Sequence, residues 1–118
     1  MSGKTSYLAG LAAEDSVEAE YVRNGHDIAA RRWRGRGGEI DIVAKDGEGF
    51  IFIEVKKARD FARAAERITR RQMHRIFGAA SEFAAKQPKG LLTPMRFDVA
   101  LVNQAGERKI IENAFAHC

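Results

Sequence analysis

The chain has 118 residues, a mass of 13.1 kDa, 45% hydrophobic residues and a formal net charge of +4 at pH 7. This length supports one domain with a substantial core, and the composition excludes a disordered or low-complexity protein. The single cysteine, Cys118, excludes an internal disulfide and a cysteine-based zinc site, and it fits a reducing cytoplasm. The apolar run before Glu14 is too short for a signal peptide or a transmembrane helix, so no membrane association is expected.

The N-terminal half of the chain predicts one helix and a three-stranded antiparallel meander. Apolar and small residues recur at helical spacing from Leu8 to Asn24, and Gly25 follows as a stop signal. About residues 1–7 are expected to be disordered, because "GKT" at positions 3–5 lacks the upstream glycine and strand of a phosphate-binding loop. The predicted strands are His26–Arg34, Glu39–Ala44 and Phe50–Lys57, with turns at "RGRGG" and "KDGEG".

Helical spacing returns in the second half, from Phe61 to about Lys86, and "QPKG" ends this predicted helix. Gln72 lies on its apolar stripe between Ile68 and Ile76, where an amide is unexpected. Two further strands are predicted, Met95–Val102 and Glu107–Phe115. The order αβββαββ predicts a single α/β domain over residues 1–118, with a central mixed five-stranded sheet flanked by helices.

The third predicted strand carries two charged residues where burial is expected. Side chains alternate across a strand, so Glu54 and Lys56 project from the same face as Phe50 and Phe52. The Asp-Gly turn pairs this strand with the preceding one and brings Asp41 toward Glu54. The pairing register is not fixed by the sequence, so the closeness of these two carboxylates is an inference.

In the second predicted strand, alternation places Asp41 on one face with Val43, and Ile40 and Ile42 on the other. Two buried carboxylates need a cation or a shared proton nearby. One interpretation is structural, in which Lys56 pairs with Glu54 and an arginine pairs with Asp41. The other is a site for Mg²⁺ or Mn²⁺, which prefer oxygen ligands and often bind one or two carboxylates together with a substrate phosphate.

These residues resemble a known family. Asp41 followed by Glu54-Val55-Lys56 is similar to the D…ExK core of the PD-(D/E)XK nuclease superfamily. The longer pattern "AAED", "RRWR", "GGEIDIVAKDG", "FIFIEVKKAR", "ITRRQ" and "RFDVALV" resembles the YraN-like family of small bacterial predicted endonucleases, distantly related to archaeal Holliday junction resolvases. The resemblance extends from about Gly10 to Phe115. The superfamily proline is absent, since Ile40 precedes Asp41.

The resemblance implies a restriction-endonuclease-like fold and metal-dependent hydrolysis of phosphodiester bonds. It implies that Asp41, Glu54, the Val55 carbonyl and Glu14 bind Mg²⁺ or Mn²⁺. It also implies that Lys56 positions the attacking water. Gln72 would be a polar site residue on the long helix, although a hydrogen-bonded core amide explains it equally well.

Basic residues cluster on both sides of the acidic hairpin and favour a polyanionic partner, most simply DNA. Phosphate contacts of this kind position a nucleic acid without reading its sequence, so structure-selective cleavage of branched, flapped or single-stranded DNA is expected. The rival interpretation is a non-catalytic nucleic-acid-binding domain, and junction-cutting relatives suggest a possible homodimer. The predicted phosphate-binding residues are Arg31, Arg32, Arg34, Arg36, Arg63, Arg67, Arg70, Arg71 and Arg75.

Four other positions allow more than one interpretation. Trp33 is more often a core residue than a base-stacking one. Glu39 is either a further ligand or a neighbour of the site, and Asp98 is either an ion-pair residue or a remote support for the site. His26 and the other histidines lack ligand spacing.

Overall fold

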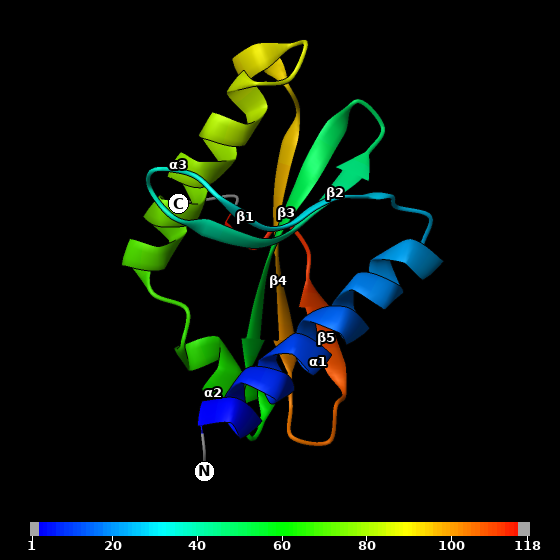
Figure 1. Ribbon diagram of the computed structural model, residues 1–118, viewed down its shortest axis with the longest axis vertical. Coiled ribbons are helices and arrows are strands. Elements are labelled where there is room, and N and C mark those ends of the chain that lie inside the picture. Colours follow the sequence, from blue (N-terminus) through cyan, green and yellow to red (C-terminus); the bar gives the residue numbers. More distant parts are fainter. Residues whose placement is uncertain (1–2, 116–118) are drawn as a thin grey trace.

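The computed structural model describes residues 3–115, and it describes only the backbone of residues 3–8. Figure 1 shows a central sheet with α1 on one side and α3 on the other. Within the described residues, no helix is long and apolar enough to cross a membrane. The elements are α1 (Gly3–Arg23), β1 (Ile28–Arg34), β2 (Glu39–Asp46), β3 (Gly49–Lys57), α2 (Phe61–Glu66), α3 (Arg70–Ala85), the 3-10 helix η1 (Gly90–Leu92), β4 (Met95–Val102) and β5 (Arg108–Ile111).

The five strands form one mixed sheet in the order β1-β2-β3-β4-β5. Strand β3 pairs with β4 in parallel, and the other three neighbouring pairs are antiparallel. The prediction of an α/β domain with a mixed five-stranded sheet is therefore confirmed. The turn between β2 and β3 has two residues, Gly47 and Glu48, and Gly47 takes a positive φ of 60° that glycine adopts easily.

The predicted long helix is two helices, so the prediction of one helix from Phe61 to Lys86 is wrong. Helix α2 ends at Glu66, and α3 begins at Arg70. Thr69 has an extended backbone, and its hydroxyl accepts a hydrogen bond from the Gln72 backbone N–H at 3.1 Å. This N-cap gives the free amides of a new helix a partner, and it starts α3 in the middle of the apolar stripe.

Other boundaries differ less. Helix α1 begins at Gly3, so it includes positions 3–7, which the sequence analysis assigned to a disordered N-terminus; Met1 and Ser2 lie outside the described residues. The fifth strand ends at Ile111, four residues before Phe115. Cys118 also lies outside the described residues.

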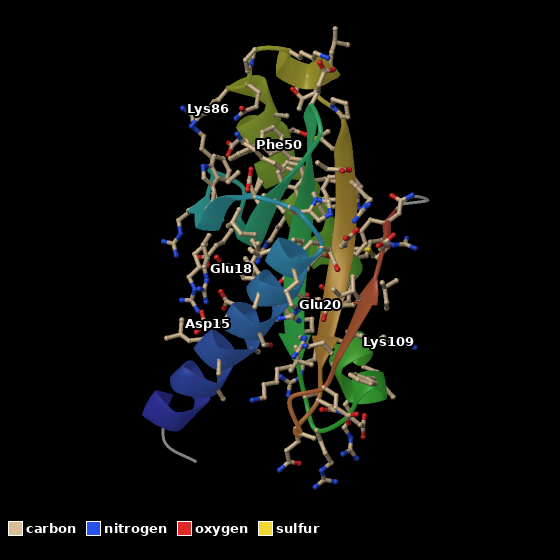
Figure 2. All side chains as sticks on the ribbon, turned by 90° about the vertical axis from the view of Figure 1, so that its right-hand side faces the viewer. Asp15, Glu18, Glu20, Phe50, Lys86 and Lys109 are labelled. Atoms are coloured by element: carbon tan, nitrogen blue, oxygen red, sulfur yellow. The ribbon has the colours of Figure 1, made fainter. Side chains whose placement is uncertain are left out.

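The sheet separates two apolar clusters. Helix α3 covers the first and α1 covers the second, so each helix buries one face of the sheet. The first cluster stacks aromatic rings, for example Phe52 against Phe97 with their centroids 5.5 Å apart. Figure 2 shows Phe50 on this side, close to α3. The α3-side cluster includes Ile40, Val43, Phe50, Phe52, Ile76, Phe83 and Phe97, and the α1-side cluster includes Val17, Tyr21, Ile42, Ile51 and Ile53.

Strand alternation fails at one point of β2. Ile42 packs on the α1 side, whereas Ile40 packs with Val43 on the α3 side, so the prediction that Ile40 and Ile42 face the same way is wrong. The pairing register leaves Arg32 of β1 opposite this point, and its φ is 52°. A non-glycine residue in the left-handed region is strained, and here it accompanies a reversal of the alternation in both strands.

Candidate functional site

The carboxylates of β2 and β3 meet where the pairing of these strands ends. The last pair is Ile42 with Ile53, so Asp41 and Glu54 are the next residues on each strand. Asp41 accepts a hydrogen bond from the Val55 backbone N–H at 2.8 Å from its Oδ2 atom. The side chain of Asp41 therefore replaces the missing backbone partner, and it fixes this carboxylate at the end of the hairpin.

The Glu54 carboxyl has a raised pKa. Burial raises the pKa of the Glu54 carboxyl, and a hydrogen bond with Asp41 and the Asp41 charge raise it further, from 4.5 to about 9. The charge of Lys56 offsets only part of this increase. The pair therefore holds a proton at neutral pH, as two carboxylates do when they share one site without a stronger cation.

Lys56 lies beside this pair and is nearly buried. Its Nζ is 3.6 Å from Glu54 Oε1, and its side chain is 15% exposed. With the amide of Gln72 oriented to satisfy both of its ends, the Gln72 oxygen accepts a hydrogen bond from Lys56 Nζ at 2.7 Å. The Gln72 nitrogen then donates to the Arg67 carbonyl at 2.9 Å. The amide on the apolar stripe of α3 thus orients the lysine next to the carboxylates.

Glu14 approaches the same place from α1, but its carboxylate is bound elsewhere. Arg32 donates to both of its oxygens, at 3.1 and 2.9 Å, and Arg31 Nε lies 3.9 Å away. Among the described residues, no group of three or more acidic, histidine or cysteine side chains is arranged to hold a metal ion. Asp41 and Glu54 therefore form a two-carboxylate site, with Glu14 in the same cleft but held by arginines.

The site opens into a cleft of about 850 Å³ between α1 and the end of β3. Small residues of α1, Ala9, Gly10 and Ala13, line the side from which Glu14 projects. The other side carries basic groups that the sequence analysis did not assign to the site, except for Arg67. The basic residues of this opposite wall are Lys57, Arg59 and Arg67, and the uncharged Gln104 also lines the cleft.

The predicted phosphate-binding arginines fall into two groups. Arg31 pairs with Asp15 and Glu18 of α1, the second at 3.0 Å, and Figure 2 shows both acids on that helix. Arg34 pairs with Glu39 at 3.1 Å, and this pair lies outside the lining of the cleft. Within the described residues, no acidic partner contacts the side chains of Arg36, Arg67, Arg70, Arg71 and Arg75, whereas Arg32 binds Glu14 and Arg63 lies 3.9 Å from Asp60.

Trp33 and Asp98 contact core residues rather than the cleft. Trp33 packs edge-on against Phe83, with the centroids 5.5 Å apart. Asp98 is fully buried and accepts hydrogen bonds from Tyr21 at 2.6 Å and from Arg96 at 3.0 and 2.9 Å, which is the ion-pair interpretation of this residue.

Sequence comparison decides the family. The model of the family described as "Uncharacterised protein family UPF0102" matches residues 13–102. The chain belongs to the UPF0102 family. This confirms the resemblance to the YraN-like family.

Relatives with UPF0102 names match almost the whole chain. One from Cereibacter sphaeroides strain ATCC 17029 is 60% identical over 116 residues, covering 98% of this chain and 99% of its own. Another from Ruegeria pomeroyi is 56% identical over 115 residues, covering 98% of this chain and 94% of its own. A more distant one from Dinoroseobacter shibae is 39% identical over 111 residues, covering 94% of this chain and 83% of its own. These names state no activity, so the chemistry of this UPF0102 protein has to be argued from its site.

Proposed function

We propose that this UPF0102 protein is a Mg²⁺- or Mn²⁺-dependent endonuclease that hydrolyses phosphodiester bonds of DNA in the cytoplasm. The observation that carries the proposal is the Asp41–Glu54 pair. Two carboxylates that retain a proton at neutral pH mark a place where a divalent cation can replace that proton. A nearly buried lysine lies next to them, and the cleft in front of them is open to a substrate.

The donors fit the proposed metal. Magnesium usually takes one or two protein carboxylates and completes its shell with waters and substrate phosphates, so a third acidic ligand is not required. Asp41, Glu54 and the Val55 carbonyl would hold the ion. When bound, it would stabilise the negative charge on the attacking and leaving oxygens.

The rest of the chemistry belongs to side chains of this chain. Lys56 would orient the attacking water and offset the charge that develops at phosphorus. Gln72 would keep the Lys56 ammonium beside Glu54 rather than in solvent. The attacking water would release one proton to solvent as its oxygen forms the new bond to phosphorus; the bond to the leaving oxygen would break, and that oxygen would take up a proton from solvent.

The placement of charge on α3 supports a polyanionic substrate. Arg70 and Arg71 occupy its first turn, where there is no acidic residue. Cations at a helix N-terminus face the positive end of the helix dipole and destabilise the helix by about 0.3–1 kcal/mol each. Arg70 and Arg71 are exposed and have no acidic partner among the described residues, so they are available to phosphate groups. Phosphate contacts carry no sequence information, so the protein would select DNA by its shape. A homodimer would suit branched substrates.

A second candidate function is a nucleic-acid-binding domain without catalysis. The hydrogen bonds of Arg32 to Glu14 favour this alternative, because the Glu14 carboxylate is then not free to bind a metal ion together with Asp41 and Glu54. In this alternative the Asp41–Glu54–Lys56 group is a buried polar network that stabilises the hairpin.

A cleavage panel separates these functions. Single-stranded, flapped and four-way-junction DNA are incubated with the full chain and Mn²⁺ or Mg²⁺, beside the variants Asp41→Asn, Lys56→Ala and Lys109→Ala. Lys109 is exposed on β5, as Figure 2 shows, and serves as the control for loss of one cation. We expect cutting by wild type and by Lys109→Ala, and no cutting by the other two, which still bind.

Three results would count against the proposal. Cutting that survives both Asp41→Asn and Lys56→Ala belongs to a contaminant. Salt-sensitive binding without cutting of any substrate supports the binding domain. A melting temperature that does not rise with Mn²⁺ in wild type also counts against a metal site, because a ligand of the folded state stabilises it.

A further inference from the structure

In addition to its first wall, which carries Asp41, Glu54 and Lys56, the cleft has a second, basic wall. Lys57, Arg59 and Arg67 line it, and all three are cations. Lys57 ends β3, Arg59 follows it by two residues, and Arg67 is the C-terminal cap of α2, so the fold gathers them from two segments. Lys57 and Arg59 have no role in the chemistry described above.

The backbone of this wall is fixed by three hydrogen bonds. Arg67 Nη1 donates to the Lys57 carbonyl at 2.9 Å, which holds the guanidinium over the end of β3. The Gln104 backbone N–H donates to the Arg59 carbonyl at 3.2 Å, and the Ala58 N–H donates to the Val102 carbonyl at 3.1 Å. The wall is therefore part of the rigid sheet and the turn before β5.

The charges of this wall are not neutralised by the protein. Within residues 9–115, no ion pair involves Lys57, Arg59 or Arg67. The three acids of the cleft have other partners, since Glu14 binds Arg32 and Glu54 shares its surroundings with Asp41 and Lys56. Three unpaired cations along one wall repel one another, and an anion in the cleft would remove this cost.

The spacing of the two walls selects the kind of anion. Lys57 lies three residues beyond Glu54 on β3, about 10 Å further along at the usual rise of a strand, and by alternation it projects from the opposite face, so the cleft passes around the end of this strand. One phosphate group is too small to touch both ends of this span, whereas successive phosphates of one nucleic-acid strand can do so.

We propose that Lys57, Arg59 and Arg67 bind the phosphates next to the scissile one, so that the cleft holds successive phosphates of a single strand. This inference rests on the proposed function, because it names the part of the substrate that the second wall takes. Arg67 also links this wall to the lysine of the first, since its carbonyl accepts the Gln72 amide.

Metal-free binding tests the second wall separately from catalysis. The affinity of the full chain for a short fluorescent single-stranded oligonucleotide is measured by anisotropy in EDTA at several salt concentrations. The variants are Lys57→Ala, Arg59→Ala, Arg67→Ala and the control Lys109→Ala, with Arg67→Lys added because Arg67 also holds the Lys57 carbonyl.

We expect each alanine variant of the wall to bind about tenfold more weakly and to reduce the salt slope by about 0.7, the value for one phosphate contact on a single strand. Arg67→Lys should recover most of the slope, because it keeps the charge. Unchanged affinity and slope in all three alanine variants would overturn the inference. If the wall variants lose binding but wild type cuts no substrate, the phosphate-binding role of the second wall is supported and the nuclease proposal is refuted. If wild type cuts and the wall variants bind normally, the nuclease proposal is supported and the role of the second wall is refuted.

Discussion

Arg32 binds both carboxylate oxygens of Glu14, at 3.1 and 2.9 Å, from a backbone held at a φ of 52°. Strain of this kind costs about 1–3 kcal/mol and persists only where the surroundings hold it. The compensation here is a paired carboxylate, since Glu14 is only 7% exposed. The arginine therefore takes up both oxygens of an acidic group that lines the cleft.

Removal of this arginine should make the protein depend more on metal. We expect Arg32→Ala to lose about 1–2 kcal/mol of stability without metal, because Glu14 keeps only Arg31 at 3.9 Å as a neighbour. Mn²⁺ should then raise the melting temperature more in Arg32→Ala than in wild type, as the freed carboxylate joins the ion. The matched control is Arg34→Ala, whose partner Glu39 is exposed and outside the cleft lining. Equal Mn²⁺ shifts in all three proteins would exclude Glu14 as a ligand.

The Asp41–Glu54 pair predicts a stability that falls as the pH rises. The pKa of Glu54 is about 9 in the folded chain against an ordinary 4.5, so the folded state binds more protons between these values. Stability then decreases with pH over this window, because the unfolded state has already lost the proton. We expect the melting temperature to decline between about pH 6 and pH 9 in wild type and to decline less in Glu54→Gln, measured by scanning fluorimetry.

The affinity for a divalent metal should depend on the release of the same Glu54 proton. If a divalent ion takes its place, Mn²⁺ affinity rises with pH below about 9, and binding releases roughly one proton. Calorimetry in two buffers of different ionisation enthalpy measures this release. Proton-independent binding would place the ion away from Glu54.

The Gln72 amide predicts a positioning effect on catalysis. Gln72→Leu removes the hydrogen bond to Lys56 at 2.7 Å and leaves the ammonium free to move. We expect a loss of stability of about 1 kcal/mol, an at least tenfold lower kcat and unchanged DNA binding in EDTA. Gln87→Leu is the control, because Gln87 follows the end of α3 outside the cleft lining and its side-chain amide donates to the Phe83 carbonyl at 3.3 Å. Equal kcat values for Gln72→Leu and Gln87→Leu would remove this role.

The Asp98 network predicts a purely structural effect. Asp98 is completely buried and accepts from Tyr21, Arg96 and the Asn113 backbone, the last at 3.0 Å. Asp98→Ala leaves an arginine and a buried hydroxyl without their acceptor, so we expect a loss of about 3–5 kcal/mol in urea unfolding. Tyr21→Phe should cost about 1–2 kcal/mol. Because neither residue lines the cleft, Tyr21→Phe should keep wild-type Mn²⁺ affinity; a large loss of affinity would connect this network to the site.

Much of the fold was readable from local patterns. The Asp-Gly turn fixed the β2–β3 hairpin, and uninterrupted apolar residues marked β4, which has the bounds Met95–Val102 as predicted. Strand alternation placed Glu54 and Lys56 side by side, and the ion pair at 3.6 Å agrees with it. These features depend on neighbours in the chain, which is why sequence reasoning reaches them.

The rest depends on distant contacts. Nothing in "RRWR" indicates that Arg32 adopts a positive φ, and its contact with the carboxylate of Glu14 on α1 joins residues 18 positions apart in the chain. The break before α3 has a local signal in Thr69, but the continuous apolar stripe outweighed it. Gln104 reaches the cleft from the turn before β5, a position that only the sheet order reveals. Lys57 and Arg59 could have been assigned to the site from the sequence, because they follow the Glu54-Val55-Lys56 motif within three residues.

The parallel pairing of β3 with β4 has a consequence for the kinetics of folding. The β2–β3 hairpin closes through a two-residue turn, whereas β3 meets β4 only after residues 58–94, with α2 and α3, have formed a crossover. Non-local pairing is slow, because the entropy of closing a long loop is lost before any contact compensates it. The acidic pair can therefore form early, and we expect closure of the crossover, which brings Arg67 to the end of β3, to set the folding rate.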